Sequence, residues 1–198
     1  MELLPMTFAS GWASGINAYA TVLVLGLVGR FADVSDVPAG FERTDVLIVM
    51  GVLALLELVA DKVPYIDSTW DAISTIIRPV AGAVIGALIA GDSGNLLTIT
   101  LASVGGVTAL LSHVTKSGLR LAINTSPEPV TNVTASIGND IGVVSIASLA
   151  VLNPVAAAVI AGLILVLGIV IVALLFGRIR KGVRTVRRWM SSPAPDTA

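Results

Sequence analysis

The sequence of 198 residues contains no cysteine and a single histidine, His113. Without cysteine, disulfides, thiolate metal sites and cysteine nucleophiles are excluded. A zinc site built on one histidine would need carboxylates for most of its ligands, which is uncommon. The motifs of zinc proteases, nucleophile elbows and phosphate loops are also missing. The sequence therefore predicts no metal and no cofactor, and it favours a non-enzyme while leaving catalysis open.

Charged residues are scarce as well, at 13% of the chain, where a soluble domain carries about 25%. Hydrophobic residues make up 55% and form long runs. The N-terminus carries Glu2 instead of a basic segment, so we interpret it as part of the mature first helix and not as a signal peptide. This composition predicts a multi-pass protein of the cell (inner) membrane that contacts lipids and binds no nucleic acid.

The apolar runs predict an all-α polytopic membrane protein with about six transmembrane or partly spanning helices in one domain, residues 1–178. The six stretches are Met6–Gly29, Asp45–Ala60, Pro79–Gly91, Leu96–Val114, Asn139–Leu152 and Val155–Phe176. Spanning takes about 20 residues, so the third and fifth stretches are short. Either they recruit the flanking residues 72–77 and 131–138, or they are partial spans supported by protein.

Basic residues favour one side of this arrangement. If the six stretches alternate, ten of the twelve Lys and Arg residues fall on the side that also carries the C-terminal tail, and only Arg30 and Arg43 fall on the other. The positive-inside rule then predicts that both termini are cytoplasmic. Residues 179–198 form a basic cytoplasmic tail, which we expect to be partly disordered and to contact an anionic leaflet.

The segment between the second and third stretches has two faces at helical spacing. Ile66, Trp70, Ile73 and Ile77 form the apolar face, and Asp67, Asp71, Ser74 and Arg78 form the polar one. This pattern predicts a short amphipathic helix at the cytoplasmic interface, ended by Pro79. The interfacial candidates are Asp67, Trp70, Asp71 and Arg78, and the alternative is a connector whose charges only face water.

An internal repeat is left open. GVLALLELVADK (Gly51–Lys62) aligns without gaps with GVTALLSHVTKS (Gly106–Ser117). Matches of this kind arise easily in a chain rich in Ala, Val, Leu and Gly. Internal duplication is nevertheless common in transporter folds, where binding sites lie between the repeats.

Two groups of charged residues are candidates for a binding site. Glu57 and Asp61 are one helical turn apart, and Glu57 lies within or at the edge of the hydrocarbon, where ionisable groups are costly. Lys116 and Arg120 can share a helical face with His113, in a segment that then meets glycine and proline. The alternatives are snorkelling or pairing for the carboxylates, and an ordinary cytoplasmic loop for the basic residues.

Two polar segments complete the candidates. Asn139 and Asp140 stand near the start of the fifth stretch, where Asp140 either interacts with a helix dipole or neutralises Arg120 or Lys116. Asn17 lies on a stripe of polar and small residues in the first stretch, for which helix packing is the commoner explanation.

Three motifs resemble a bacterial membrane family known as domain of unknown function 4126. They are Ser14–Ala18, the run from Glu57 to Asp67 with Asp71 and Arg78-Pro79, and Lys116–Arg120. The resemblance covers about residues 8–178 and implies an integral membrane protein with no assigned activity. Similar sequences tend to read Gly-Leu-Arg where this one has Gly15-Ile16-Asn17, which puts in doubt a role that needs two matched arginines.

The sequence is compatible with two functions. The first is a small transporter or channel for an unknown solute or ion, with a polar site near the cytoplasmic side. The second is a non-catalytic membrane scaffold or assembly factor whose charges form a structural ion-pair network. A lipid-modifying enzyme has the least support, because an Asp-x-x-x-Asp pair alone is a weak magnesium signal. Substrate and oligomeric state are left open, a homo-oligomer included.

Overall fold

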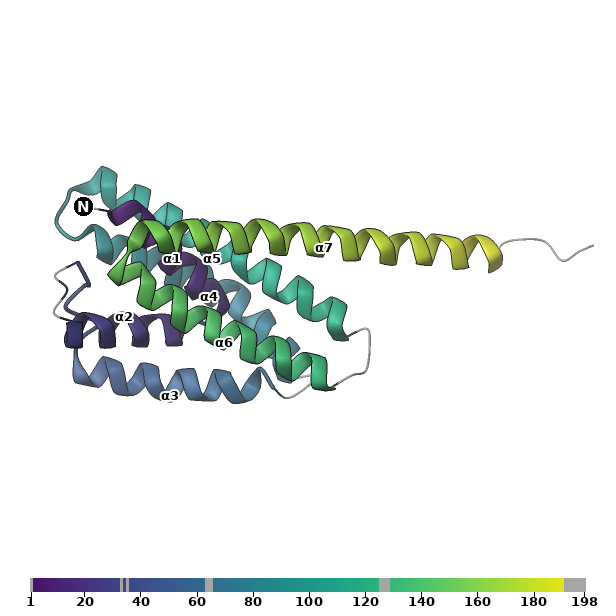
Figure 1. The fold of residues 1–198 in the computed structure, drawn as a ribbon, viewed down its shortest axis with the longest axis horizontal. Helices are drawn as coiled ribbons and strands as arrows, with labels where there is room; N and C mark the ends of the chain where they lie inside the picture. Colours follow the sequence, from purple (N-terminus) through teal and green to yellow (C-terminus); the bar gives the residue numbers. More distant parts are fainter. Residues whose placement is uncertain (1, 33, 35, 63–65, 125–128, 191–198) are drawn as a thin grey trace, which may run out of the picture.

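The computed structural model describes residues 2–32, 34, 36–62, 66–124 and 129–190. Within these residues the chain is helical, without strands (Figure 1). The helices are α1 (Leu3–Ile16), α2 (Ala18–Ala32), α3 (Thr44–Ala60), α4 (Ile66–Ala90), α5 (Asn95–Asn124), α6 (Pro129–Leu152) and α7 (Pro154–Met190). The all-α prediction is confirmed.

Four helices in the described residues are long and apolar enough to cross a membrane. Their apolar segments are Thr69–Ala90, Asn95–Ile123, Val133–Leu152 and Pro154–Arg178. Large aliphatic side chains stay exposed on the outside of the bundle, among them Leu163 at 67% and Ile76 at 73%. Aliphatic surface of this extent is suited to lipid, and the chain is an integral, multi-pass membrane protein.

The first predicted stretch, Met6–Gly29, is not a single span. The chain turns back at Asn17, whose backbone is extended (φ −151°, ψ 102°). The Asn17 side-chain Oδ1 accepts a hydrogen bond from the Ala20 N–H at 2.8 Å and so caps the start of α2. With 14 and 15 residues, α1 and α2 each reach only about 21–23 Å, less than the hydrocarbon core of about 30 Å.

The two halves run antiparallel as a re-entrant hairpin with its tip at Asn17. Met6 of α1 and Leu25 of α2 belong to one buried cluster with Leu101 and Val151, so both open ends of the hairpin lie where α5 begins and α6 ends. From that end α7 runs the length of the bundle and beyond it (Figure 1). In the described residues α1 thus begins and α7 finishes at opposite ends of the bundle, which is not the arrangement expected for two cytoplasmic termini.

The separate interfacial helix is also absent from the described residues. Instead α4 continues from Ile66 to Ala90 with Pro79 inside it, so the third predicted stretch recruits residues 72–77. Likewise α6 starts at Pro129 and recruits residues 131–138. The predicted tail is helical up to Met190 as the continuation of α7, and residues 191–198 lie outside the described part.

Helices α1, α4 and α5 approach one another most closely at glycines. A Cβ atom added to Gly11 of α1 would lie 2.7 Å from the carbonyl oxygen of Gly105, and one added to Gly82 would lie 2.5 Å from the same oxygen. Since real Cβ contacts are not that short, no larger residue fits there without a shift of backbone. This contact brings the hairpin tip between α4 and α5.

Candidate functional site

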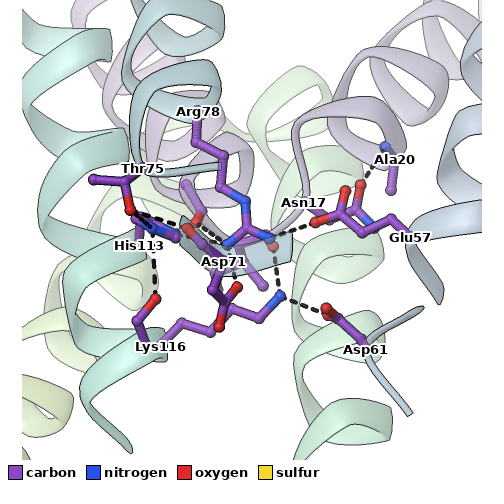
Figure 2. A network of polar contacts seen from close by, with 12 residues as sticks. Asn17, Ala20, Glu57, Asp61, Asp71, Thr75, Arg78, His113 and Lys116 are labelled. Carbon is purple, nitrogen blue, oxygen red and sulfur yellow. Dashed lines mark hydrogen bonds and ion pairs between the residues drawn. The ribbon is translucent and has the colours of Figure 1, made fainter. Parts of the chain in front are cut away.

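Polar and charged side chains from the end of α3, the first half of α4 and the second half of α5 converge beside the hairpin tip (Figure 2). We call this set the charge cluster: Glu57, Asp61, Asp71, Arg78, His113, Lys116 and Arg120. None of its members is more than 6% exposed. Charges this deep inside a membrane protein are costly unless they are paired, so their partners define the site.

Arg78 lies at the centre of the charge cluster (Figure 2). Its Nη2 donates to Glu57 Oε1 at 2.5 Å. Its Nη1 contacts His113 Nδ1 at 2.7 Å, the Gly15 carbonyl oxygen at 3.3 Å and Asp71 Oδ1 at 3.5 Å. One guanidinium thus joins the hairpin tip, α3, α4 and α5.

These contacts determine the state of the His113 ring. A guanidinium has no acceptor, so Nδ1 must offer its lone pair to Arg78. The ring proton is then on Nε2, which lies 3.0 Å from Thr75 Oγ1. Thr75 uses its own hydroxyl proton to donate to the Asp71 carbonyl oxygen at 2.9 Å, so it accepts from Nε2. His113 is a neutral ring in this arrangement.

A second part of the charge cluster is centred on Asp61. Lys116 Nζ lies 2.6 Å from Asp61 Oδ2, and Arg120 Nη1 lies 3.2 Å from Asp61 Oδ1. Arg120 Nη1 also lies 3.0 Å from Asp71 Oδ2 and so links the two parts. Burial raises the pKa of Asp61, which follows α3, but Lys116 and Arg120 outweigh burial and hold that pKa below its usual value.

The hairpin tip contributes backbone oxygens. The Ile16 carbonyl accepts from Lys116 Nζ at 2.9 Å, and the Gly15 carbonyl faces Arg78. These are among the last carbonyls of α1, which have no partner within the helix and carry the negative end of its dipole. The hairpin therefore presents partial negative charge to two buried cations.

The charges of the cluster balance. Three carboxylates face three cations, and the histidine is neutral. Local sequence explains why they meet: Asp71 and Arg78 are seven residues apart on α4, and His113, Lys116 and Arg120 follow i, i+3, i+7 spacing on α5. Each helix therefore turns one charged stripe inward.

The sequence candidates are partly brought together. Glu57, Asp61, Lys116 and Arg120 all belong to the charge cluster. Asp140 is not among those contacts and pairs with Lys62 instead, with 3.2 Å between Oδ2 and Nζ. Lys62 is thus a partner that neither of the two alternatives for Asp140 named.

The two asparagine candidates have different surroundings. Asn17 is buried at the hairpin tip as the cap of α2. Asn139 is half-buried and lines a cavity of about 70 Å³ together with Lys116 and Trp12. Asn17 therefore serves the start of a helix, and Asn139 forms part of a cavity wall.

The interfacial candidates are corrected by the structure. Asp71 and Arg78 are 6% and 1% exposed, so they face the protein interior and not water. Trp70 is half-buried, and its indole N–H has no hydrogen-bond partner among the described residues. The side chain of Asp67 lies outside the described part.

His113 belongs to the charge cluster but is not among the binding-site candidates taken from the sequence. Its spacing to Lys116 and Arg120 was visible, and that spacing is the signal that could have identified it. A lone histidine on an apolar helix gave no reason to expect an arginine at 2.7 Å.

Two neighbouring cavities open from the charge cluster toward the surface of the bundle. One of about 270 Å³ is lined by Asp71, Thr75, Ser117, Arg120 and their neighbours. The next, of about 310 Å³, shares Thr75 and Ser117 and adds His113. In the described residues, no group of three or more acidic, histidine or cysteine side chains is placed to hold a metal ion.

Comparison with known proteins gives one match. A family model described as "Domain of unknown function (DUF4126)" matches residues 4–173. No curated protein and no solved structure matches the chain. The matched range includes nearly all of the hairpin, the charge cluster and most of the apolar part of α7.

Proposed function

The chain belongs to the DUF4126 family, whose description names no activity, and from that premise we propose that it is a small membrane transporter. The charge cluster is its ion-coupling site. The observation that carries this proposal is the gathering of six charged groups, each at least 94% buried, around the tip of a re-entrant hairpin. Transporters use interrupted helices near the middle of the bilayer in this way, with helix ends directed at ions.

The positive-inside rule supports an orientation for this site. Lys62 follows the end of α3, and Arg178 and the basic residues of the tail lie in the last part of α7, whereas Arg30 and Arg43 lie near the opposite end. The first end is accordingly the cytoplasmic one, and the N-terminus is on the other side. The charge cluster then lies in the cytoplasmic half of the membrane, near the ends of α3 and α5.

The pairing suggests how transport can proceed. Because each charge is matched, an ion that binds to the cluster must replace one of the existing partners. Protonation of Glu57 would release Arg78, the guanidinium that joins α3 to α4 and α5. Along α3, Leu55 is 64% exposed and Val59 is 60% exposed, so this helix is peripheral. When the Glu57–Arg78 pair opens, α3 is held to the cluster by the pairs of Asp61 with Lys116 and Arg120.

The test is flux in proteoliposomes that contain the purified chain and an internal pH or ion indicator. We expect wild-type flux of protons or of a small ion, and loss of flux in Glu57→Gln and Arg120→Gln. Asp45→Asn is the matched control, because its carboxylate pairs with Arg43 at the surface. Wild-type rates in both cluster variants would overturn the proposal.

A scaffold is the second candidate, and the balance of charges favours it. In the described residues every cluster carboxylate contacts a cluster cation, as a purely structural network would require. If it is a scaffold, Glu57→Gln and Arg120→Gln lower the thermal stability in detergent, and wild-type vesicles carry no flux of protons, sodium, potassium, chloride or phosphate.

A further inference from the structure

Three hydroxyl groups on α1 are buried without a partner. Thr7, Ser10 and Ser14 are each 0% exposed, and among the described residues none of their oxygens has a hydrogen-bond partner. Spacings of three and four residues put them on one face of the helix. We call Thr7, Ser10 and Ser14 the hydroxyl row. It runs from the open end of the hairpin toward its tip.

Many hydroxyls elsewhere in the bundle are satisfied by their own helix, although Ser136 on α6 is likewise buried without a partner among the described residues. On α5 five of them donate to the carbonyl oxygen four residues earlier, at distances between 2.7 and 3.1 Å: Thr98, Thr100, Ser103, Thr108 and Thr115. The hydroxyl row makes no such bond. A buried hydroxyl without a partner is costly, so a bound molecule that donates and accepts hydrogen bonds would stabilise these three groups.

The hydroxyl row ends at the charge cluster. Ser14 precedes Gly15, whose carbonyl oxygen accepts from Arg78 Nη1. Arg78 Nε is likewise buried and lacks a hydrogen-bond partner among the described residues, as does Asp71 Oδ1 at 3.5 Å from Arg78 Nη1. Unsatisfied polar atoms therefore occur both along α1 and at the cluster that its tip reaches.

The opposite side of α1 packs against apolar side chains. Ala9, Trp12, Ala13 and Ile16 pack in an apolar cluster with residues of α6 and α7. Thr7 instead faces α4 and α5, since a Cβ atom added to Gly86 would lie 3.0 Å from Thr7 Cγ2 and one added to Gly105 would lie 3.5 Å from it. Ser10 and Ser14 share the face of Thr7 by helical spacing. Alanine and hydroxyl positions on one helix thus have equal burial but different surroundings.

We propose that the hydroxyl row holds a single file of water molecules that carries protons from the end where α1 begins to the charge cluster. The inference rests on the proposed function and names the proton as the ion of that site. Full burial of the row excludes a larger solute, whereas a water supplies the two to four hydrogen bonds that such a site needs. The last water gives a proton to a cluster carboxylate. As that O–H bond forms, the O–H bond of the water breaks and is restored along the file.

The natural absence of cysteine makes the test direct. The single variants Ser10→Cys and Ser14→Cys are reconstituted in proteoliposomes and treated with silver ion, a thiol reagent of nearly the size of water. Ala9→Cys and Ala13→Cys are the matched controls, because both positions are 0% exposed on the apolar side of α1. We expect cysteines at the two row positions to react about tenfold faster or more than cysteines at the two control positions. A thiol buried among apolar side chains has a raised pKa, and an increase of one unit lowers its thiolate fraction about tenfold.

Proton flux separates this inference from the function on which it rests. Slower flux in Ser14→Ala, together with silver reactivity at Ser10→Cys, supports the water file. Equal reactivity of row and control positions overturns it, and the transport proposal still stands if Glu57→Gln abolishes flux. Reactive row positions without any wild-type proton flux overturn proton delivery and the transport proposal together.

Discussion

Arg78 is 1% exposed, as deeply buried as Met6 and Ile85. A buried ion pair gains little over an apolar pair, but a buried charge left alone is strongly destabilising. The geometry of Arg78 is consistent with this rule, since its guanidinium reaches a carboxylate, a neutral ring and a backbone carbonyl at once. Its partners are therefore needed even if the cluster adds nothing to stability as a whole.

A double-mutant cycle tests this at the Arg78–Glu57 pair. Arg78→Met should lower the free energy of unfolding by about 3–5 kcal/mol, because it leaves Glu57 buried and unpaired. Glu57→Met should cost a similar amount, and the double variant should cost clearly less than the sum of the two. Equilibrium unfolding in mixed detergent micelles measures all three.

Arg43→Met is the control for that cycle. Its ion pair with Asp45 is 67% and 63% exposed, so its removal should leave stability unchanged within error. Additive effects of Arg78→Met and Glu57→Met would contradict the coupling that the structure assigns to this pair.

Among the elements, the site depends most on the close contact of α1, α4 and α5. Gly105 of α5 meets Gly82 of α4 and Gly11 of α1 at distances that leave no room for a side chain. Helix packing in membranes draws much of its stability from such small residues. The same contact sets the depth of the hairpin tip and therefore the contacts of Gly15 and Ile16 with the cluster.

Gly105→Ala should therefore destabilise the protein by about 1–3 kcal/mol, the usual cost of overpacking. Thermal unfolding in detergent is the measurement. Gly138→Ala on α6 is the matched control, because a Cβ atom added there meets nothing within 4 Å. An unchanged melting temperature for Gly105→Ala would show that the helices can separate without cost.

Sequence patterns predicted the helices better than their orientation. The apolar runs identified α3, α5 and α7, because hydrophobicity over many residues determines burial in a membrane. The two faces of α4 were also visible, but the polar face was expected to meet water. In a membrane that face turns inward, because Asp71 and Arg78 find partners there while Ile73 and Ile76 meet lipid.

The re-entrant hairpin was not predictable from local pattern. Met6–Gly29 has the length and apolarity of a single span, and Asn17 alone does not require a reversal. The turn depends on tertiary contacts that no short window contains, such as Lys116 donating to the Ile16 carbonyl. The pairing of Asp140 with Lys62 escaped prediction for the same reason, since nothing local distinguished it from the neighbouring cations.

At the scale of the whole molecule, the hairpin determines at which end of the bundle each part of the chain lies. Because the chain turns back at Asn17, α1 begins at the end opposite to the one where α7 finishes (Figure 1). The loop between α2 and α3 lies at the same end as the start of α1, because Val37 and Phe41 share a buried cluster with Met6.

Single cysteines in the cysteine-free chain test this topology. Glu2→Cys and Gly40→Cys should react with a membrane-impermeant maleimide from one face of sealed vesicles, and Gly177→Cys should react from the other. All three positions are exposed. Labelling of Glu2→Cys and Gly177→Cys from the same face would mean that the first segment crosses the membrane.

The break at Asn17 also bears on biogenesis. A half-membrane helix cannot stay in lipid by itself, because its ends would leave backbone groups unsatisfied in hydrocarbon. The surfaces that receive α1, on α4 and α5, are translated only after it. We therefore expect α1 to dock only after α4 and α5 have been synthesised, so that a helix made earlier is assembled later.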